Sequence, residues 1–558
     1  MRLSLSDLTE LLSGVQAYSV TAPLALEHSA LIGLYGPEFS SGLVCEVPFD
    51  QLPLAIEALY IPDGVPTYVH GLKRIWENYN TYKYLYVTKP DFLFDTRLMA
   101  YLLDPDAGEE DGLSLTHLCN KYLEEEYPYR IINIYDNAAD LAFDDMLAYD
   151  ACLIYRLGQV MPALMDTQLR RLYRDLELPF MAVLHEMRVD GIGVDGGAAQ
   201  SQRDRTIADL TELDLEITGG AAVNLHSERE LFHFLVANGV KFLDRGIYSR
   251  QRVDADGLEA MAASYPLVRK VLEWQALARD LSFLELASGK NRLHATWGQT
   301  RSGTSRIYAR DPALQTVSRR LRHLFVPAPG CELIKADYSQ AQMRILAHLS
   351  QDENLIALFR DGRKVHRETQ EWLGIDYDSA KQVNFGICFG ISAAGLAAKI
   401  NSVRAERGRD LPPDQQEPEI DAEVAQSYID GFYARYPGVR EFYDREWSAL
   451  KKRPQRDRVV KSLLGRTRRF GVYASSKVQR QFRVTWPQQI EADMLKTAVV
   501  RLDRVFRRRK MQARIVMMIH DSLWVEAPHE EVDQVRHLMG RMMTTALKLS
   551  VPLEVDFC

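Results

Sequence analysis

Residues 334–350, IKADYSQAQMRILAHLS, are the stretch that most constrains the fold of this chain. Leu333 to Lys335 read as a short strand that ends at Ala336, and apolar residues recur at helical spacing from Gln340 to Leu349. Asp337 therefore lies where a strand gives way to a helix. A carboxylate in this position is well placed to bind a hard cation at the mouth of a cleft, and equally to cap the helix that follows. Asp337 by itself does not distinguish the two.

A second stretch, residues 379–390 (SAKQVNFGICFG), places a cation and two aromatic rings on one face of a predicted helix. Lys381, Phe385 and Phe389 follow one another at positions i, i+4 and i+8, with Cys388 as an alternative to Phe389. This surface suits a nucleotide, with the lysine on the phosphates and the rings against sugar and base. A helix with both rings in the core and the lysine snorkelling at its edge fits the pattern too.

A third stretch, residues 515–527, reads as a β-hairpin with its polar residues at the turn. Apolar runs lie on both sides of His520 and Asp521, and Ser522 begins the second run. A carboxylate between two apolar strands is costly to bury unless it is paired or binds a metal. An exposed turn aspartate is the alternative.

Length and charge bound the class of protein. A chain of 558 residues is too long for one core and predicts roughly three or four domains or subdomains. Its formal net charge of −8 does not indicate a nucleic-acid binder, so DNA binding requires local basic surface. Residues 444–484 and 319–322 are rich in Lys and Arg, although such runs are usually solvated faces.

The cysteines and the N-terminus indicate a compartment. The six cysteines are scattered without a CxxC pair, which argues against a zinc site and a disulfide framework and suits a reducing environment. The first residues lack a signal-peptide pattern, and no apolar run approaches the length of a membrane span. We therefore expect an intracellular, soluble protein with no membrane partner.

The rest of the chain predicts a small α/β unit followed by helices and loops. The expected paired strands are residues 29–35 and 42–47. The expected helices are residues 118–122, 146–157, 161–184, 228–238 and 267–288. The expected polar loops are residues 298–306, where Arg301 and Arg306 suit a phosphate or base edge, and residues 401–420.

The three stretches, in this order, resemble the polymerase motifs of the DNA polymerase I family (family A). DYSQAQMR at residues 337–344 is similar to the first palm motif, usually DYSQIELR; residues 381–390 resemble the fingers helix, commonly KxxNFGxxYG; and residues 520–522 resemble the third motif, His-Asp-Glu. Further matches are Thr304–Arg306, Asp311–Gln315, His366–Arg367, Arg435–Gly438, Gly465–Arg466, Gln488 and Asp493. The resemblance is dense over residues 160–558 and faint before them.

The resemblance implies an α/β and α+β multidomain fold: a right-hand polymerase of palm, fingers and thumb, preceded by a 3′–5′ exonuclease-like (RNase H-like) α/β domain. The implied domains are residues 1–160 (exonuclease-like), 161–300 (thumb with a connecting helix), 301–350 (first part of the palm), 351–445 (fingers) and 446–558 (second part of the palm). No 5′-nuclease domain is expected, so the chain resembles a large-fragment-like enzyme of viral, plasmid or cellular origin.

The implied activity is template-directed addition of dNMPs to a primer 3′ end by two-metal-ion nucleotidyl transfer. The implied catalytic residues are Asp337, Asp521 and Lys381, and the implied ligands of two Mg²⁺ ions, which Mn²⁺ can replace, are Asp337, Asp521 and the Tyr338 carbonyl. The implied dNTP contacts are Gln342, His366, Lys381, Phe385 and Phe389. The implied primer–template contacts are Arg306, Gln315, Arg480, Gln488 and His520. The partners are then DNA and dNTPs, for a monomer in the cytoplasm of a bacterial or phage-infected cell, associated with the nucleoid.

The chain departs from the family pattern at four positions of the polymerase site. The first-motif Glu, a steric gate against a ribose 2′-hydroxyl, is Gln342 here, which has the same length without the charge. Ser522 replaces the third-motif Glu and removes a carboxylate near the metals, and Phe389 replaces a Tyr. Tyr377 replaces a triphosphate-binding Arg. Two cations are candidates to supply the missing charge: Arg363 and Lys364.

The N-terminal unit departs further from the family. The first-strand Asp-x-Glu of the exonuclease falls at Ser19 and Thr21, the second Asp at Ile75 and the last-motif Tyr at Met146; only Asp150 is kept. Without carboxylates nothing holds the metal ions, so we expect no proofreading. Two alternatives to a replicative enzyme stay open: a specialised polymerase for lesion bypass, reverse transcription or a modified genome, and a catalytically idle DNA-binding scaffold.

Overall fold

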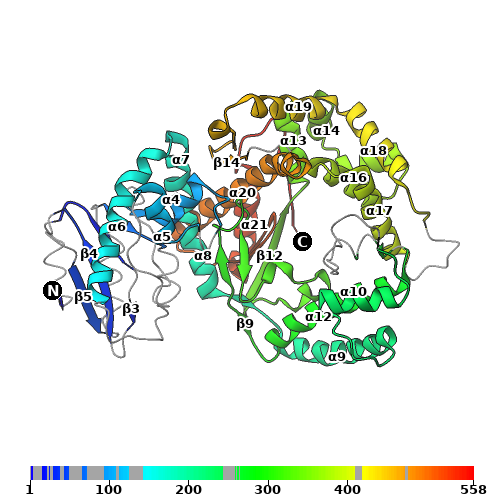
Figure 1. Cartoon of the computed structure of the whole chain (residues 1–558), viewed down its shortest axis with the longest axis horizontal. Helices are drawn as coiled ribbons and strands as arrows, with labels where there is room; N and C mark the ends of the chain where they lie inside the picture. The colour runs from blue at the N-terminus through cyan, green and yellow to red at the C-terminus, as the bar shows by residue number, and fades with distance from the viewer. Residues whose placement is uncertain are drawn as a thin grey trace.

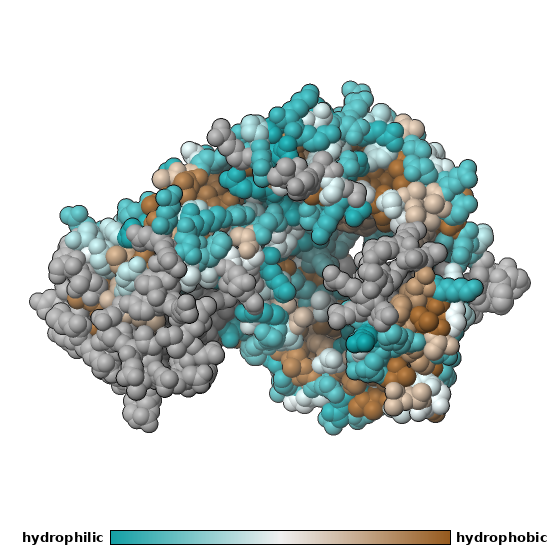
Figure 2. Space-filling view, in the orientation of Figure 1, coloured by the Kyte–Doolittle hydropathy of each residue, from teal (hydrophilic) through white to brown (hydrophobic). Residues whose placement is uncertain are grey.

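The computed structural model describes most of the chain. The described residues are 2–3, 15–21, 24–25, 29–37, 43–48, 66–71, 93–108, 112–124, 143–242, 258, 261–262, 264–408, 417–471 and 475–557. Figure 1 shows an N-terminal sheet on the left, a central sheet, and two groups of helices that frame an opening on the right. The space-filling view is hollowed at the same place (Figure 2).

A four-stranded antiparallel sheet forms the centre of the molecule. Its strands, in spatial order, are β15 (Arg514–Ile519), β16 (Ser522–Pro528), β12 (Cys331–Tyr338) and β17 (Val555–Phe557). The predicted hairpin is confirmed, because β15 and β16 pair directly. The predicted end of the first strand at Ala336 is wrong: β12 continues through Tyr338, because it is paired with β16 on one side and with β17 on the other.

Helix α21 (Val532–Thr544) packs on this sheet. Helix α20 (Ser476–Arg509) packs on α21 and on α13 (Ala341–Ser350). The apolar face of α21 buries Val535, Leu538 and Met539, as the helical spacing of these residues requires. None of the helices in the described residues is long and apolar enough to cross a membrane.

A helical arm extends from the central sheet at the upper right of Figure 1. Its helices are α14 (Glu353–Arg360), α15 (Val365–Leu373), α16 (Tyr377–Phe389), α17 (Ala393–Arg407), α18 (Ala422–Arg435) and α19 (Pro437–Lys452). Asp352, Asp376 and Asp421 cap α14, α16 and α18 by accepting main-chain N–H groups.

The predicted loop over residues 401–420 is wrong in its first part, because α17 continues to Arg407. The side chain of Asn401 bonds both the N–H and the carbonyl of Ile420 at 2.9 Å, which fastens the returning chain to this helix. Arg404 adds a bond to the carbonyl of Pro418 at 2.6 Å. Residues 409–416 lie outside the described part of the chain.

The second group of helices lies across the opening from the arm (Figure 1). It consists of α9 (Gly196–Thr218), α10 (Glu228–Ala237) and α12 (Pro266–Ala287), which confirms the predicted helices over residues 228–238 and 267–288. Ser227 caps α10 as its sequence predicts, accepting from the N–H of Glu230 at 3.3 Å. Leu231, Leu235 and Val271 belong to an apolar cluster separate from the main core.

The N-terminal unit is a mixed seven-stranded sheet covered by helices. Its strands, in spatial order, are β1 (Arg2–Leu3), β5 (Leu43–Pro48), β4 (Ser29–Tyr35), β2 (Tyr18–Val20), β6 (Thr67–Val69) and β7 (Leu93–Asp95), with β3 (Leu24–Ala25) beside β4. Its helices are α4 (Thr96–Leu103), α5 (Leu115–Tyr122) and α6 (Phe143–Leu164). Helix α6 lies so close to β4 that a Cβ at Gly33 would come within 2.3 Å of the Leu147 carbonyl oxygen, so only glycine fits there.

Short elements connect these units. The helical ones are α7 (Thr167–Leu172), the π-helix η2 (Tyr173–Glu177), α8 (Leu178–Asp190) and the 3₁₀ turns η4 (Leu314–Thr316), η5 (Arg319–Leu324), η7 (Gln455–Asp457) and η8 (His529–Glu531). The strands are β8 (Ile192–Gly193), β9 (Arg292–Leu293), β10 (Thr296–Gly298), β11 (Tyr308–Arg310), β13 (Val459–Lys461) and β14 (Thr467–Arg469).

A buried ionic cluster joins η2 to α20 and to the loop before β14. Arg466 contacts Glu177 and bonds to Asp493 at 2.6 Å, and Lys496 bonds to Glu177 at 2.8 Å. These side chains are at most 1% exposed. Arg466 and Asp493, which matched the family pattern, therefore hold the fold together at this point, and Arg466 is not part of a basic surface.

Candidate active site

Two carboxylates meet at one end of the central sheet. Asp337 lies in β12 directly opposite Ser522 of β16, and Asp521 forms the tip of the hairpin, where His520 has a φ of 56°. The two carboxyl groups lie close enough for each to affect the pKa of the other. The helix-cap alternative for Asp337 is wrong, because α13 begins beyond Gln340, which is its N-cap residue.

The electrostatics of this pair favour a bound cation. Burial raises the pKa of Asp521 well above its ordinary range, and the charges of Glu491 and Asp337 raise it further. Burial also raises the pKa of Asp337, and Lys381 is near enough to oppose this. Two carboxyl groups that close resist joint ionisation unless positive charge lies between them.

Helix α16 presents Lys381, Phe385 and Phe389 on one half-exposed face. The Lys381 ammonium lies 5.8 Å from the Phe385 ring centre, and the two rings are stacked at 6.3 Å with their planes 13° apart. Cys388 is instead fully buried and contacts Met343. Both rings are half-buried, and Phe389 packs against the main core, so the alternative in which both rings belong to the core holds in part for Phe389 only.

His366 lies beside this face on α15. It is 3% exposed, and its ring centre is 5.5 Å from that of Phe385. Burial, helped by the charge of Lys381, lowers its pKa to about 4, so the ring is neutral. Its Nδ1 lies 2.9 Å from the Asn384 amide nitrogen. Because an amide nitrogen only donates, Nδ1 accepts, and the ring proton is on Nε2.

Glu491 of α20 is a residue of this site that the sequence analysis missed. Its carboxylate accepts from the Gln342 amide at 2.9 Å and from Arg306 at 2.6 Å. Gln342 and Glu491 are both buried. The sequence offered no local signal for it, because Gln489, Asp493 and Lys496 in the same segment are also polar or charged.

The predicted DNA-contact residues lie around this centre, and they differ in exposure and in the hydrogen bonds they form. The Gln315 amide is used within the fold, donating to the Met518 carbonyl at 3.1 Å, whereas Gln488 is half-buried on α20. His520 and Arg480 are exposed, the latter near the start of α20 with its Cγ beside Gly390. Burial lowers the pKa of His520, and the charge of Arg306 lowers it further, so these two of the five residues lie near each other.

The two basic segments differ in the ion pairs that their cations form within the fold. Arg320 forms an ion pair with Asp280, while the charge of Arg322 reaches Asp337 and His520. In the segment 444–484, several cations are already paired within the fold: Lys461 with Asp166, Arg466 with Glu177 and Asp493, and Arg468 with Asp106. The local basic surface is therefore smaller than the sequence indicates.

Arg367 is a better candidate than Arg363 or Lys364 to supply the positive charge that the family pattern has at position 377. Arg363 forms an ion pair with Glu368, which occupies its guanidinium. Lys364 is exposed at the start of α15. Arg367 instead lies with its guanidinium 5.4 Å from the Tyr377 ring centre, on the side of α15 that faces α16.

The positions aligned with exonuclease carboxylates serve the fold of the N-terminal sheet. Ser19 is fully buried and donates to the Ala151 carbonyl, and Thr21 accepts from the Gly33 N–H at 2.8 Å. Met146 and Asp150 are half-buried on α6. Ile75 lies outside the described residues.

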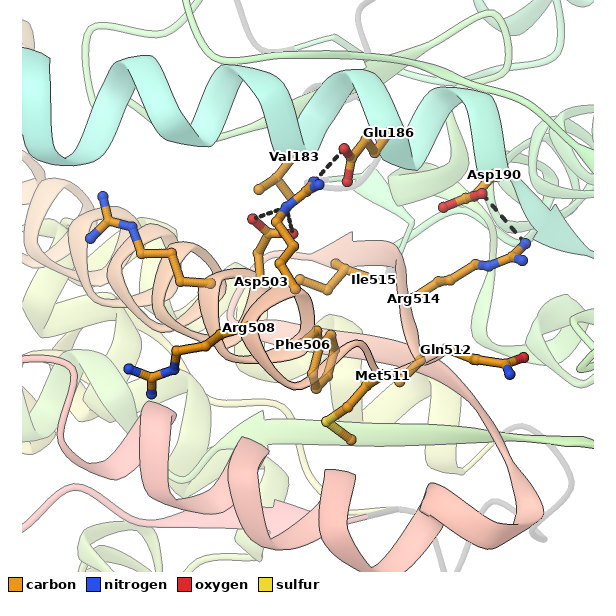
Figure 3. A pocket seen from close by; sticks show the side chains of 13 residues that line it. Val183, Glu186, Asp190, Asp503, Phe506, Arg508, Met511, Gln512, Arg514 and Ile515 are labelled. Atoms are coloured by element: carbon orange, nitrogen blue, oxygen red, sulfur yellow. Dashed lines mark hydrogen bonds and ion pairs between the residues drawn. The ribbon is translucent and has the colours of Figure 1, made fainter. Parts of the chain in front are cut away.

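A cavity of about 760 Å³ lies between α8, α20 and β15 (Figure 3). Arg507 lies between two carboxylates, contacting Glu186 and bonding to Asp503 at 3.0 Å. Arg514 pairs with Asp190 at 3.4 Å across the cavity. The lining includes no residue predicted for the polymerase site, so this is a separate feature of the molecule.

We expect Glu186→Gln to flatten the pH dependence of the melting temperature between about pH 5 and pH 7. Burial raises the pKa of Glu186 from 4.5 to about 7 in the folded protein. The folded state therefore binds more protons than the unfolded state in this window, and the group's contribution to stability, full below about pH 4.5, declines as the pH rises through 7. Thermal melts at half-unit intervals test this. Glu530→Gln, at an exposed site, is the control; equal slopes for wild type and Glu186→Gln would contradict the prediction.

Comparison with known proteins identifies relatives over most of the chain. The model of the family described as DNA polymerase family A matches residues 197–558. "DNA polymerase I, thermostable" of Thermus aquaticus is 30% identical over 424 residues, 70% of this chain and 48% of that protein. "DNA polymerase I" of Borreliella burgdorferi is 27% identical over 495 residues, 83% of this chain and 52% of that protein. The chain spans about half the length of the curated relatives it matches.

A solved structure has the same fold. The POL domain of Pol1 from M. smegmatis, solved in complex with a DNA primer-template and dNTP, matches with a TM-score of 0.79 at 23% identity, covering 100% of this chain and 98% of that one. The predicted right-hand fold class is thereby confirmed. The boundaries predicted between its domains stay predictions.

Proposed function

Because the chain belongs to DNA polymerase family A, we propose that it is a DNA-directed DNA polymerase that adds dNMPs to a primer 3′ end. The observation that carries this proposal is the meeting of Asp337 and Asp521, with Lys381 near enough to affect the pKa of Asp337. Asp337, Asp521 and Lys381, which are far apart in the sequence, would together carry out nucleotidyl transfer at this end of the sheet.

The oxygen ligands at this site suit divalent metal ions. Asp337, Asp521 and the Tyr338 carbonyl would hold two Mg²⁺ ions, or Mn²⁺, because hard cations prefer oxygen ligands. In the described part of the chain, no group of three or more His, Cys, Asp or Glu side chains is arranged to hold a metal. The aspartate pair would supply the side-chain ligands. When bound, the ions would activate the attacking hydroxyl and neutralise the leaving pyrophosphate.

The other side chains would bind and orient the nucleotide. Lys381 would contact the triphosphate and protonate the pyrophosphate as the primer 3′-oxygen bonds to the α-phosphorus and the bond to the leaving oxygen breaks. The stacked rings of Phe385 and Phe389 offer a surface to sugar and base. His366 would donate its Nε2 proton to a phosphate oxygen without a positive charge of its own. Arg367 is a further candidate for the triphosphate.

We further propose primer–template DNA and dNTPs as the partners of a monomer. Arg306 and Gln488 would reach minor-groove acceptors, which all correct pairs share. Gln315, Arg480 and His520 would contact the backbone or the primer end. A cytoplasmic, nucleoid-associated location stays a prediction.

Primer extension tests the proposed activity. Wild-type protein with a DNA primer–template, four dNTPs and Mg²⁺ is expected to extend the primer, and chelation by EDTA is expected to stop it. A parallel reaction on an RNA template tests the specialised alternative. No extension with either Mg²⁺ or Mn²⁺ would refute the polymerase and favour the idle scaffold.

We also propose that the N-terminal sheet has no proofreading activity. Ser19 and Thr21, which stand where metal-binding carboxylates are expected, direct their oxygens to main-chain partners in α6 and β4. A 3′-labelled mismatched primer without dNTPs is therefore expected to keep its length over hours with Mg²⁺. Shortening of the primer by wild type but not by Asp150→Ala would overturn this proposal.

A further inference from the structure

We propose that Glu491 positions the gate against ribonucleotides by holding the side chain of Gln342. Selection of deoxyribose over ribose would then depend on Glu491 as much as on Gln342. The inference rests on the proposed polymerase function and on the gate role that the family resemblance implies for Gln342. It goes beyond them by assigning a role to a residue outside the three matched motifs.

The contacts of Glu491 fix Gln342 in one orientation. The Gln342 nitrogen donates to one carboxylate oxygen of Glu491 at 2.9 Å. The Gln342 oxygen is buried without a hydrogen-bond partner among the described residues, so the bond to Glu491 is what sets the plane of this amide. A bond to a charged acceptor in a buried place is stronger than a bond between neutral groups.

The second oxygen of Glu491 is occupied by Arg306. Their ion pair is 2.6 Å long, and the Glu491 side chain is 4% exposed. Both carboxylate oxygens are engaged, so Glu491 is arranged to hold its two neighbours in place. It also connects Arg306, the proposed minor-groove contact, with the gate residue.

Glu491 lies within the active site and not behind it. Its charge acts on both Asp337 and Asp521, and on Cys388 of α16. Helices α13, α16 and α20 pack against one another around it. A residue at this junction can transmit the position of α20 to the nucleotide site.

The arrangement would let Gln342 serve at the position where the family motif that it resembles has Glu. The carboxylate of the pair belongs to α20 here, and the amide belongs to α13. Gln342→Glu alone would place two carboxylates at hydrogen-bonding distance, where they repel each other. Exchanging both residues, Gln342→Glu with Glu491→Gln, would restore a bond between an amide and a carboxylate with its direction reversed.

The test measures kcat/KM for one dNTP and the matching rNTP on the same primer–template. Glu491→Ala is expected to lower the dNTP-over-rNTP ratio about tenfold or more, mainly through better use of the rNTP. Gln342→Glu is expected to weaken dNTP use through a higher KM. The exchanged pair is expected to return both quantities to within about threefold of wild type.

Glu526→Ala is the matched control, because Glu526 is also a buried carboxylate paired with an arginine, Arg292 at 3.2 Å. It is expected to lower the melting temperature without changing the ratio. An unchanged ratio in Glu491→Ala, or an exchanged pair no better than Gln342→Glu, overturns the inference alone. If Glu491→Ala does not fold, the dNTP-over-rNTP ratio of the exchanged pair tests the inference. If the wild-type protein does not extend the primer with dNTPs, the proposed polymerase function is overturned, and so is the proposed gate.

Discussion

Asp521→Asn is expected to slow primer extension by about 10³-fold or more, because a lost metal ligand removes several kcal/mol of transition-state stabilisation. Binding of the primer–template should persist, since the substitution removes negative charge near the DNA. The melting temperature is expected to rise, because Asn replaces a carboxyl group whose ionised form burial and two neighbouring carboxylates disfavour. Single-turnover extension, fluorescence anisotropy and thermal melts measure the three quantities.

The control for Asp521→Asn is Asp533→Asn, at an exposed position of α21. It makes the same chemical change away from the site and should extend primers as wild type does. Extension by Asp521→Asn at more than about a tenth of the wild-type rate would be incompatible with a carboxylate that holds metal. A fall in both DNA binding and melting temperature would indicate misfolding instead of a lost ligand.

Glu177→Gln is expected to destabilise the protein by about 3–5 kcal/mol, because it breaks a buried ion cluster by removing one partner. Arg466 and Lys496 would then share Asp493 as their remaining carboxylate. The pKa of Glu177 is lowered to about 2 despite full burial, which shows how strongly these cations favour its charge. Urea unfolding followed by circular dichroism measures the loss.

The pH dependence of this effect has a definite sign. Because the folded pKa lies below the ordinary value, the contribution of Glu177 is full above about pH 4.5 and disappears as the pH falls through 2. The difference between wild type and Glu177→Gln should therefore shrink in acid. Lys461→Ala, which breaks an exposed pair with Asp166, is the control and should cost less than about 1 kcal/mol. Equal losses for the two variants would contradict the prediction.

Several elements of the fold and site were predictable because their signals are local. The spacing of apolar residues predicted α12 to within one residue at each end, and Ser227 marked the start of α10. Alternating and continuous apolar runs predicted the β15–β16 hairpin with Asp521 at its tip. The i, i+4, i+8 spacing placed Lys381, Phe385 and Phe389 on one face.

Other features were not predictable because they depend on pairing between distant segments. The continuation of β12 through Asp337 requires β17, which lies at the other end of the chain. Charge counts suggested a basic surface around Arg466, but the guanidinium of Arg466 is buried in an ion pair with Glu177, which is distant in the sequence. Arg363 was a candidate for the nucleotide until Glu368 proved to occupy it.

The sequence by itself determined the family, the periodic elements and the identity of the residues that carry the proposed chemistry. These signals depend only on residue type and on the spacing of residues a few positions apart. Only the tertiary structure decided which of those residues meet. Gln342 and Glu491 are 149 positions apart, and Glu177 and Lys496 are 319 apart. The physical reason is that a buried polar group must find its partner in the folded interior, and the choice among distant partners is made when the strands and helices pack.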